Sequence, residues 1–130
     1  MRKRLNIRSE QGQTMTEFAL VLPILVVLLF AIIQFGIAFN NYVALTDAAR
    51  AGARKGAVSR NLSNPTAACQ NQVFASATDL TASQLQVTCS SPWTPGSDVT
   101  VDAQYPYSIS LFGIPIVNGM LQTTVTERVE

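Results

Sequence analysis

The chain has 130 residues, enough for one domain, and only 13% of them are charged, against roughly 25% in an average soluble protein. Its formal net charge is +1, and the absence of histidine excludes Ser-His and Cys-His catalytic dyads. No glycine spacing matches a phosphate-binding loop, so we expect neither an enzyme nor a cofactor.

Residues 1–12 form a short, polar and basic segment that is typical of a leader. Arg2, Lys3, Arg4 and Arg8 are opposed there only by Glu10. Basic residues before an apolar span favour a cytoplasmic N-terminus. Basic residues also follow the span closely, so charge alone leaves the orientation open.

An apolar run from Phe18 to Phe39 follows, in which Gln34 is the only strongly polar side chain. About 20 apolar residues cross a bilayer core as a helix, so this run predicts a single membrane span in contact with lipid. Good helix formers continue beyond it. We therefore expect one helix over about residues 14–58, divided into a membrane half (13–39) and an amphipathic half (40–60).

Residues 61–130 predict a small α+β head. Asn64 and Pro65 are typical of a helix start, and the helical pattern runs to about Leu80. Alternating apolar residues predict three strands, over about 85–89, 99–105 and 121–129. The head is expected to be an antiparallel sheet packed on the upper part of the long helix.

The segment between the last two predicted strands, YPYSISLFGIPIVNG, is unusually apolar for a loop. One interpretation is that Ile109, Leu111, Phe112 and Ile114 fill the head's own core. The other is an interaction surface, since large exposed apolar patches mark such sites.

Cys69 and Cys89 are the only cysteines, and both lie in the head. They predict a disulfide, which needs an oxidising compartment, and so favour an exported head. Two buried free thiols are the alternative. A metal site is not expected, because histidine and a second cysteine pair are lacking.

Glu17 stands at the start of the apolar run and has several interpretations. Thr14 and Glu17 match a capping box, and the helix dipole favours an acid in the first turn. A carboxylate bordering hydrocarbon is also costly, which favours a functional role.

A glycine, an acid five residues later and an apolar helix, preceded by a basic leader, together resemble the start of type IV prepilins. The match narrows to TadE-like minor pilins of tight-adherence (Tad) systems over about 45 residues. It rests on EFALVLP at 17–23, QFG at 34–36 and the Ala- and Arg-rich segment at 44–54. TadF-like minor pilins stay open as an alternative.

The resemblance implies a type IV pilin-like fold and cleavage between Gly12 and Gln13 by a prepilin peptidase. It also implies that Glu17, followed by Phe18, contacts the N-terminal amine of a neighbouring subunit. The expected partners are other pilin or minor pilin subunits and the inner-membrane assembly platform. The implied function is assembly or priming of a Tad pilus, for adhesion or secretion, from the cytoplasmic membrane with the head outside.

Other features have competing interpretations. Pro23 is either a harmless kink or a bend that helps a helix bundle form. Gln34 is expected to bond to a neighbouring helix, and Gly36 to permit close approach. Small residues at 48–57 predict close packing of the head on its own helix. The basic residues after the span predict a solvated face, with no nucleic-acid partner.

Two rival functions stay open. The first is a signal-anchored single-pass protein whose head binds a ligand outside the cytoplasm. The second is a secreted protein that is cut after the apolar run, which the length of that run disfavours.

Overall fold

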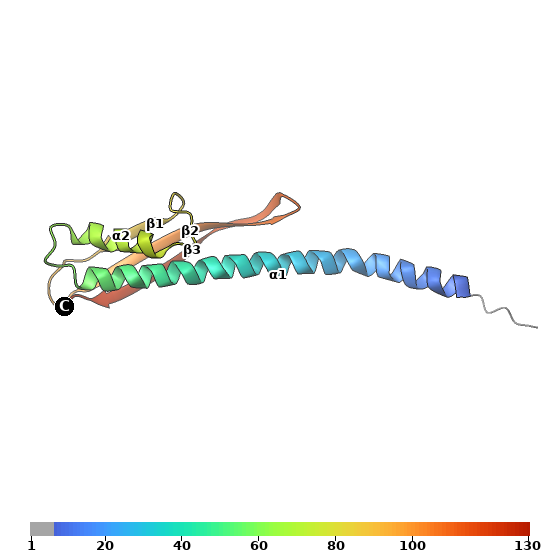
Figure 1. The fold of residues 1–130 in the computed structure, drawn as a ribbon, viewed down its shortest axis with the longest axis horizontal. Helices are drawn as coiled ribbons and strands as arrows, with labels where there is room; N and C mark the ends of the chain where they lie inside the picture. Colours follow the sequence, from blue (N-terminus) through green and yellow to red (C-terminus); the bar gives the residue numbers. More distant parts are fainter. Residues whose placement is uncertain (1–6) are drawn as a thin grey trace, which may run out of the picture.

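The computed structural model describes residues 7–130, with side chains from residue 12 onward. The elements, in chain order, are α1 (Ile7–Ala57), α2 (Pro65–Ser76), β1 (Gln86–Ser90), β2 (Asp98–Leu111) and β3 (Ile114–Arg128). This confirms the predicted α+β class, with a long N-terminal helix and a C-terminal head (Figure 1).

Helix α1 is one gently curved rod of 51 residues, and at about 1.5 Å per residue it is roughly 76 Å long. It begins at Ile7 rather than near Thr14, so it passes through Gly12. Pro23 lies inside it without ending it. Of the predicted leader (1–12), residues 1–6 lie outside the described residues, and residues 7–12 form the first turns of α1.

The head packs around the C-terminal part of α1 because that part presents small side chains. Ala48, Ala49 and Ala53 are at most 1% exposed, which confirms the predicted close packing. A Cβ atom at Gly52 would collide with Val73 of α2 and lie 3.2 Å from the Cys69 carbonyl oxygen. Glycine at position 52 is therefore what lets the two helices approach.

Helix α2 starts as predicted, with the Asn64 side chain accepting a 3.0 Å hydrogen bond from the Ala67 N–H and Pro65 in the first turn. It ends at Ser76, four residues before the predicted end at Leu80. Cys69 of α2 and Cys89 of β1 form the predicted disulfide. The bond ties α2 to the edge strand of the sheet.

The sheet is antiparallel with strand order β1-β2-β3. Its alternation places one face of β2 in the core, where Val99, Val101 and Ala103 are fully buried. Strand β1 pairs only with residues 100–104 of β2. Beyond Gln104, β2 and β3 continue alone as a two-stranded ribbon that runs back along α1 toward its N-terminal half (Figure 1).

Candidate functional site

The N-terminal half of α1 exposes large apolar side chains along its whole length. An 18-residue window reaches a mean hydropathy of 2.9, and none of it is buried in the chain. Among the predicted span residues, Phe18 is 61% and Phe39 59% exposed. Because this window stays unburied, α1 is a candidate membrane-spanning helix and does not resemble the mostly buried core helix of a globular domain.

The predicted processing site lies on an exposed, continuous stretch of this helix. A Cβ atom built at Gly12 would meet nothing within 4 Å. The Gln13 side-chain amide donates a 3.2 Å hydrogen bond to Glu17, one helical turn later. The capping box predicted for Thr14 and Glu17 is wrong for the uncleaved chain, because the helix already begins at Ile7.

Glu17 has no cationic partner among the side chains from residue 12 onward. The one ion pair in that part of the chain joins Arg50 and Asp47, 3.4 Å apart and well exposed. That pair lies near the other end of α1. The Glu17 carboxylate, at the border of the apolar run, accepts a hydrogen bond from the neutral Gln13 amide.

Gln34 is used within the chain, where the sequence led us to expect a bond to another helix. Its side-chain amide donates a 3.3 Å hydrogen bond to the Ser110 carbonyl oxygen of β2. Gly36 has open space around its Cβ position, so it makes no close approach to other parts of the described chain. The contact of Gln34 brings the apolar half of α1 and the head together.

The predicted loop between the last two strands is the distal part of the β2–β3 hairpin, so the loop prediction is wrong. The strands are joined by a two-residue turn at Phe112 (φ 50°) and Gly113 (φ 82°). Two positive φ values in a two-residue hairpin loop are typical of a type I′ turn. The sequence did carry a signal for this, since Tyr105, Tyr107, Ile109 and Leu111 continue the alternation.

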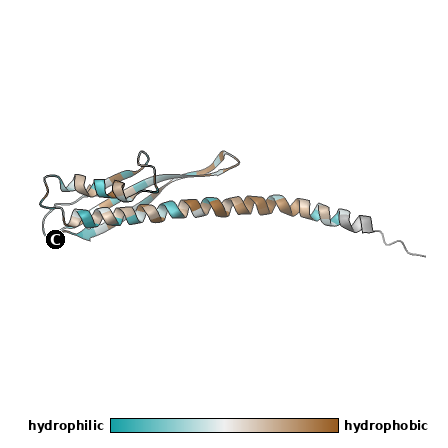
Figure 2. Cartoon of the chain, viewed as in Figure 1, coloured by the Kyte–Doolittle hydropathy of each residue, from teal (hydrophilic) through white to brown (hydrophobic). Residues whose placement is uncertain are grey.

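The core-filling interpretation of this segment is also wrong, because its tip points away from the head's core. Phe112 is 71% and Ile114 68% exposed, and Leu111 is half-buried. The Phe112 ring contacts Phe30 of α1, with ring centroids 5.4 Å apart. We define the hairpin tip as residues 111–117. Figure 2 shows the apolar hairpin tip and the apolar half of α1 at the same level along the molecule.

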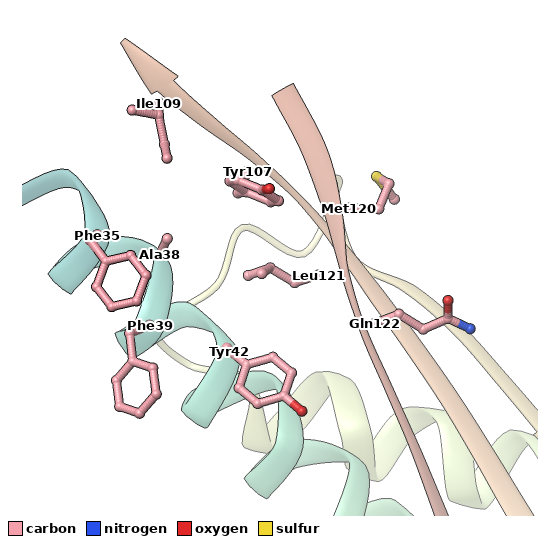
Figure 3. A pocket seen from close by; sticks show the side chains of 9 residues that line it. All are labelled: Phe35, Ala38, Phe39, Tyr42, Tyr107, Ile109, Met120, Leu121 and Gln122. Atoms are coloured by element: carbon pink, nitrogen blue, oxygen red, sulfur yellow. The ribbon is translucent and has the colours of Figure 1, made fainter. Parts of the chain in front are cut away.

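A groove of about 420 Å³ lies between α1 and the hairpin, on the C-terminal side of Phe30 along α1. In Figure 3 the side chains of Tyr107 and Leu121 point toward α1, and Met120 and Gln122 lie on the other side of β3. From α1 the groove is lined by Phe35, Ala38, Phe39 and Tyr42. The groove is mainly apolar, and Tyr42 and Tyr107 add hydroxyl groups to its lining. It lies beside the C-terminal end of the apolar run, near Phe39.

No group of three or more metal-ligating side chains occurs in the part of the chain that the structure describes. The features that the fold brings together are instead apolar. They are the exposed half of α1, the hairpin tip beside it and the groove between them. Gly12, Gln13 and Glu17 lie at the N-terminal border of the apolar half, at least thirteen residues before Phe30, where the hairpin tip contacts α1.

The fold is thus a long helix with an exposed apolar half, which carries a small α+β head on its other half. Comparison with protein families gives a match to the model described as TadE-like protein, over residues 12–54. This confirms the predicted TadE-like resemblance for that segment of the chain. Comparisons with curated proteins and with solved structures give no match.

Proposed function

We propose that this protein is a minor pilin, or pseudopilin, that takes part in assembling or priming a Tad-type pilus. The observation that carries the proposal is the arrangement of Gly12 and Glu17 at the start of the exposed apolar run of α1, inside the segment that matches the TadE-like model. The prepilin peptidase is the proposed processing enzyme. Other pilin subunits and the inner-membrane assembly platform are the proposed partners.

Cleavage between Gly12 and Gln13 would make Gln13 the first residue of the mature helix. Its new amine would carry a positive charge next to an apolar run, one turn before Glu17. An unpaired charge in a low-dielectric surrounding is strongly unfavourable, and a well-placed partner offsets much of that cost. The lack of a cationic partner for Glu17 within the described side chains supports pairing with the amine of a neighbouring subunit.

Glycine suits the cut for two reasons. Helix α1 passes through Gly12, so a peptidase has to unwind the chain there, and glycine is about 1 kcal/mol less favourable in a helix than alanine. The fold itself does not require glycine at this position, since a Cβ atom would meet nothing within 4 Å, which favours a role for glycine in recognition by the peptidase. The proposed orientation has the N-terminus in the cytoplasm and the head outside, since the disulfide of the head needs an oxidising compartment.

The test is co-expression of the full chain with a prepilin peptidase, followed by mass spectrometry of the mature N-terminus. We expect a chain that begins at Gln13, and Gly12→Leu should stay uncut while still entering the membrane. Glu17→Gln should be cut but fail to co-purify with pilin subunits. Asp47→Asn, a carboxylate in the head-bearing half, is the matched control and should behave as the parent chain.

An uncut parent chain in the presence of active peptidase would overturn the proposal. Normal assembly of Glu17→Gln would remove the assembly role of that carboxylate and leave the cleavage site standing.

A further inference from the structure

The hairpin tip lies at the depth of the membrane-spanning run of α1. Phe30, the ring that Phe112 contacts, lies nine residues before Phe39, where the apolar run ends. At about 1.5 Å per residue this is roughly 13 Å along the helix. A bilayer core is about 30 Å thick, so the tip reaches well into the leaflet on the head's side whenever the run spans the bilayer.

The chemistry of the hairpin fits hydrocarbon at this depth. The chain carries no charged side chain between Asp102 and Glu127. At the tip, Phe112, Ile114 and Ile116 are 71%, 68% and 60% exposed. Phe112 adopts φ 50°, where asparagine or glycine is usual, so an aromatic ring is kept at the turn at a local conformational cost.

Two prolines reduce the number of backbone donors that the ribbon would bring unpaired into the bilayer. Open sheet edges are costly in hydrocarbon because their N–H and C=O groups lack partners. Here Pro106 on β2 and Pro115 on β3 lack an N–H, so neither edge offers a continuous row of donors. Gln34 donates to the Ser110 carbonyl oxygen, which gives one of the remaining groups a partner.

We propose that the tip of the β2–β3 hairpin inserts into the head-side leaflet of the bilayer, where lipid acyl chains cover its exposed apolar face. The inference rests on the membrane-anchored state of the proposed function. In that state α1 and the hairpin enter the bilayer together. The groove between them opens at the membrane surface, with Tyr42 and Tyr107 at the level where aromatic side chains are favoured.

Tryptophan depth measurements on the full chain test this in vesicles of phosphatidylcholine brominated in the middle of the acyl chains. The natural Trp93 is replaced by Phe, and Ile114→Trp reports the tip. We expect emission from Trp at position 114 to shift to the blue and to lose most of its intensity to the brominated lipid. Phe74→Trp, on the exposed face of α2, is the matched control and should keep a water-like spectrum.

Two further positions separate the possible failures. Leu25→Trp lies in the middle of the apolar run and must be quenched if α1 spans the bilayer. Met120→Trp lies on the same hairpin near the level of Phe39 and should escape mid-chain quenching. An unchanged urea transition of the head in each variant shows that the fold is retained.

Quenching at position 25 without quenching at position 114 would overturn the hairpin insertion and leave the anchor intact. Absence of quenching at both positions would overturn the anchor and the insertion together. A blue shift at position 114 that depends on protein density, without quenching by lipid, would assign the surface to a second copy of the chain and reject the lipid proposal.

Discussion

The two halves of α1 are both helical, yet they differ in what covers them. From Phe18 to Phe39 the helix carries large apolar side chains and stays exposed. From Leu45 to Ala57 it carries mainly small residues, and α2 and the sheet bury them. The comparison teaches that side-chain size, more than hydrophobicity, decides where the head packs, because only small residues let a second backbone come close.

The largest change in the stability of the head should come from removing its disulfide, which joins α2 to β1 beside the buried half of α1 (residues 45–57). Replacing Cys69 and Cys89 together by Ala removes a cross-link between residues 20 apart, which is worth about 3 kcal/mol of unfolding free energy. Urea unfolding of the full chain in micelles, followed by Trp93 fluorescence, measures the loss. Dithiothreitol should reproduce it in the parent chain and leave the double variant unaffected. An unchanged midpoint would contradict the stabilising role of the disulfide.

An intermediate effect should separate the two halves directly, by the same substitution in each. Gly52→Ala should lower the unfolding free energy of the head by about 1–3 kcal/mol, because the new methyl group collides with Val73. Gly36→Ala should leave the head's stability unchanged, since nothing lies within 4 Å of that position. The same urea transition compares them, and equal losses in the two variants would refute the size argument.

The smallest effect should come from the exposed ion pair on the covered half. Asp47 and Arg50 have side chains 67% and 60% exposed. Pairs of this kind contribute less than about 1 kcal/mol. Asp47→Asn should therefore move the urea midpoint very little, and Arg50→Gln should match it. A loss as large as that of Gly52→Ala would show that the pair has a role in packing that its exposure does not suggest.

Local patterns were sufficient wherever neighbours in sequence decide the structure. The start of α2 was predictable from two neighbouring residues. The Asn64 side chain accepts a hydrogen bond from a backbone N–H of the first turn, and Pro65 has no N–H that needs a partner. The start of α1 was not, because the Thr14–Glu17 pattern matches a cap that the uncleaved helix does not use. If the proposed cleavage between Gly12 and Gln13 occurs, the same residues stand in the first turn of the mature helix, where their pattern fits.

The distal hairpin was missed for a different reason. The turn has Phe112 at a positive φ value, which is unusual for phenylalanine, so the sequence carries only a weak turn signal there. The partners that fix its position, Phe30 and Gln34, lie more than seventy residues earlier in the chain. Pairing over such a separation leaves no signature in a local window of the sequence.

The sequence by itself determined the apolar span, the TadE-like front, the helix start at Asn64 and the two cysteines that form the disulfide. Each depends on composition or on spacings within a few turns of chain, where local sterics and hydropathy dominate. Only the tertiary structure decided that the β2–β3 hairpin runs back beside α1 and carries its apolar tip to the level of the span. That placement depends on the packing of the head on the small residues of α1, which fixes the direction in which the two long strands leave the core.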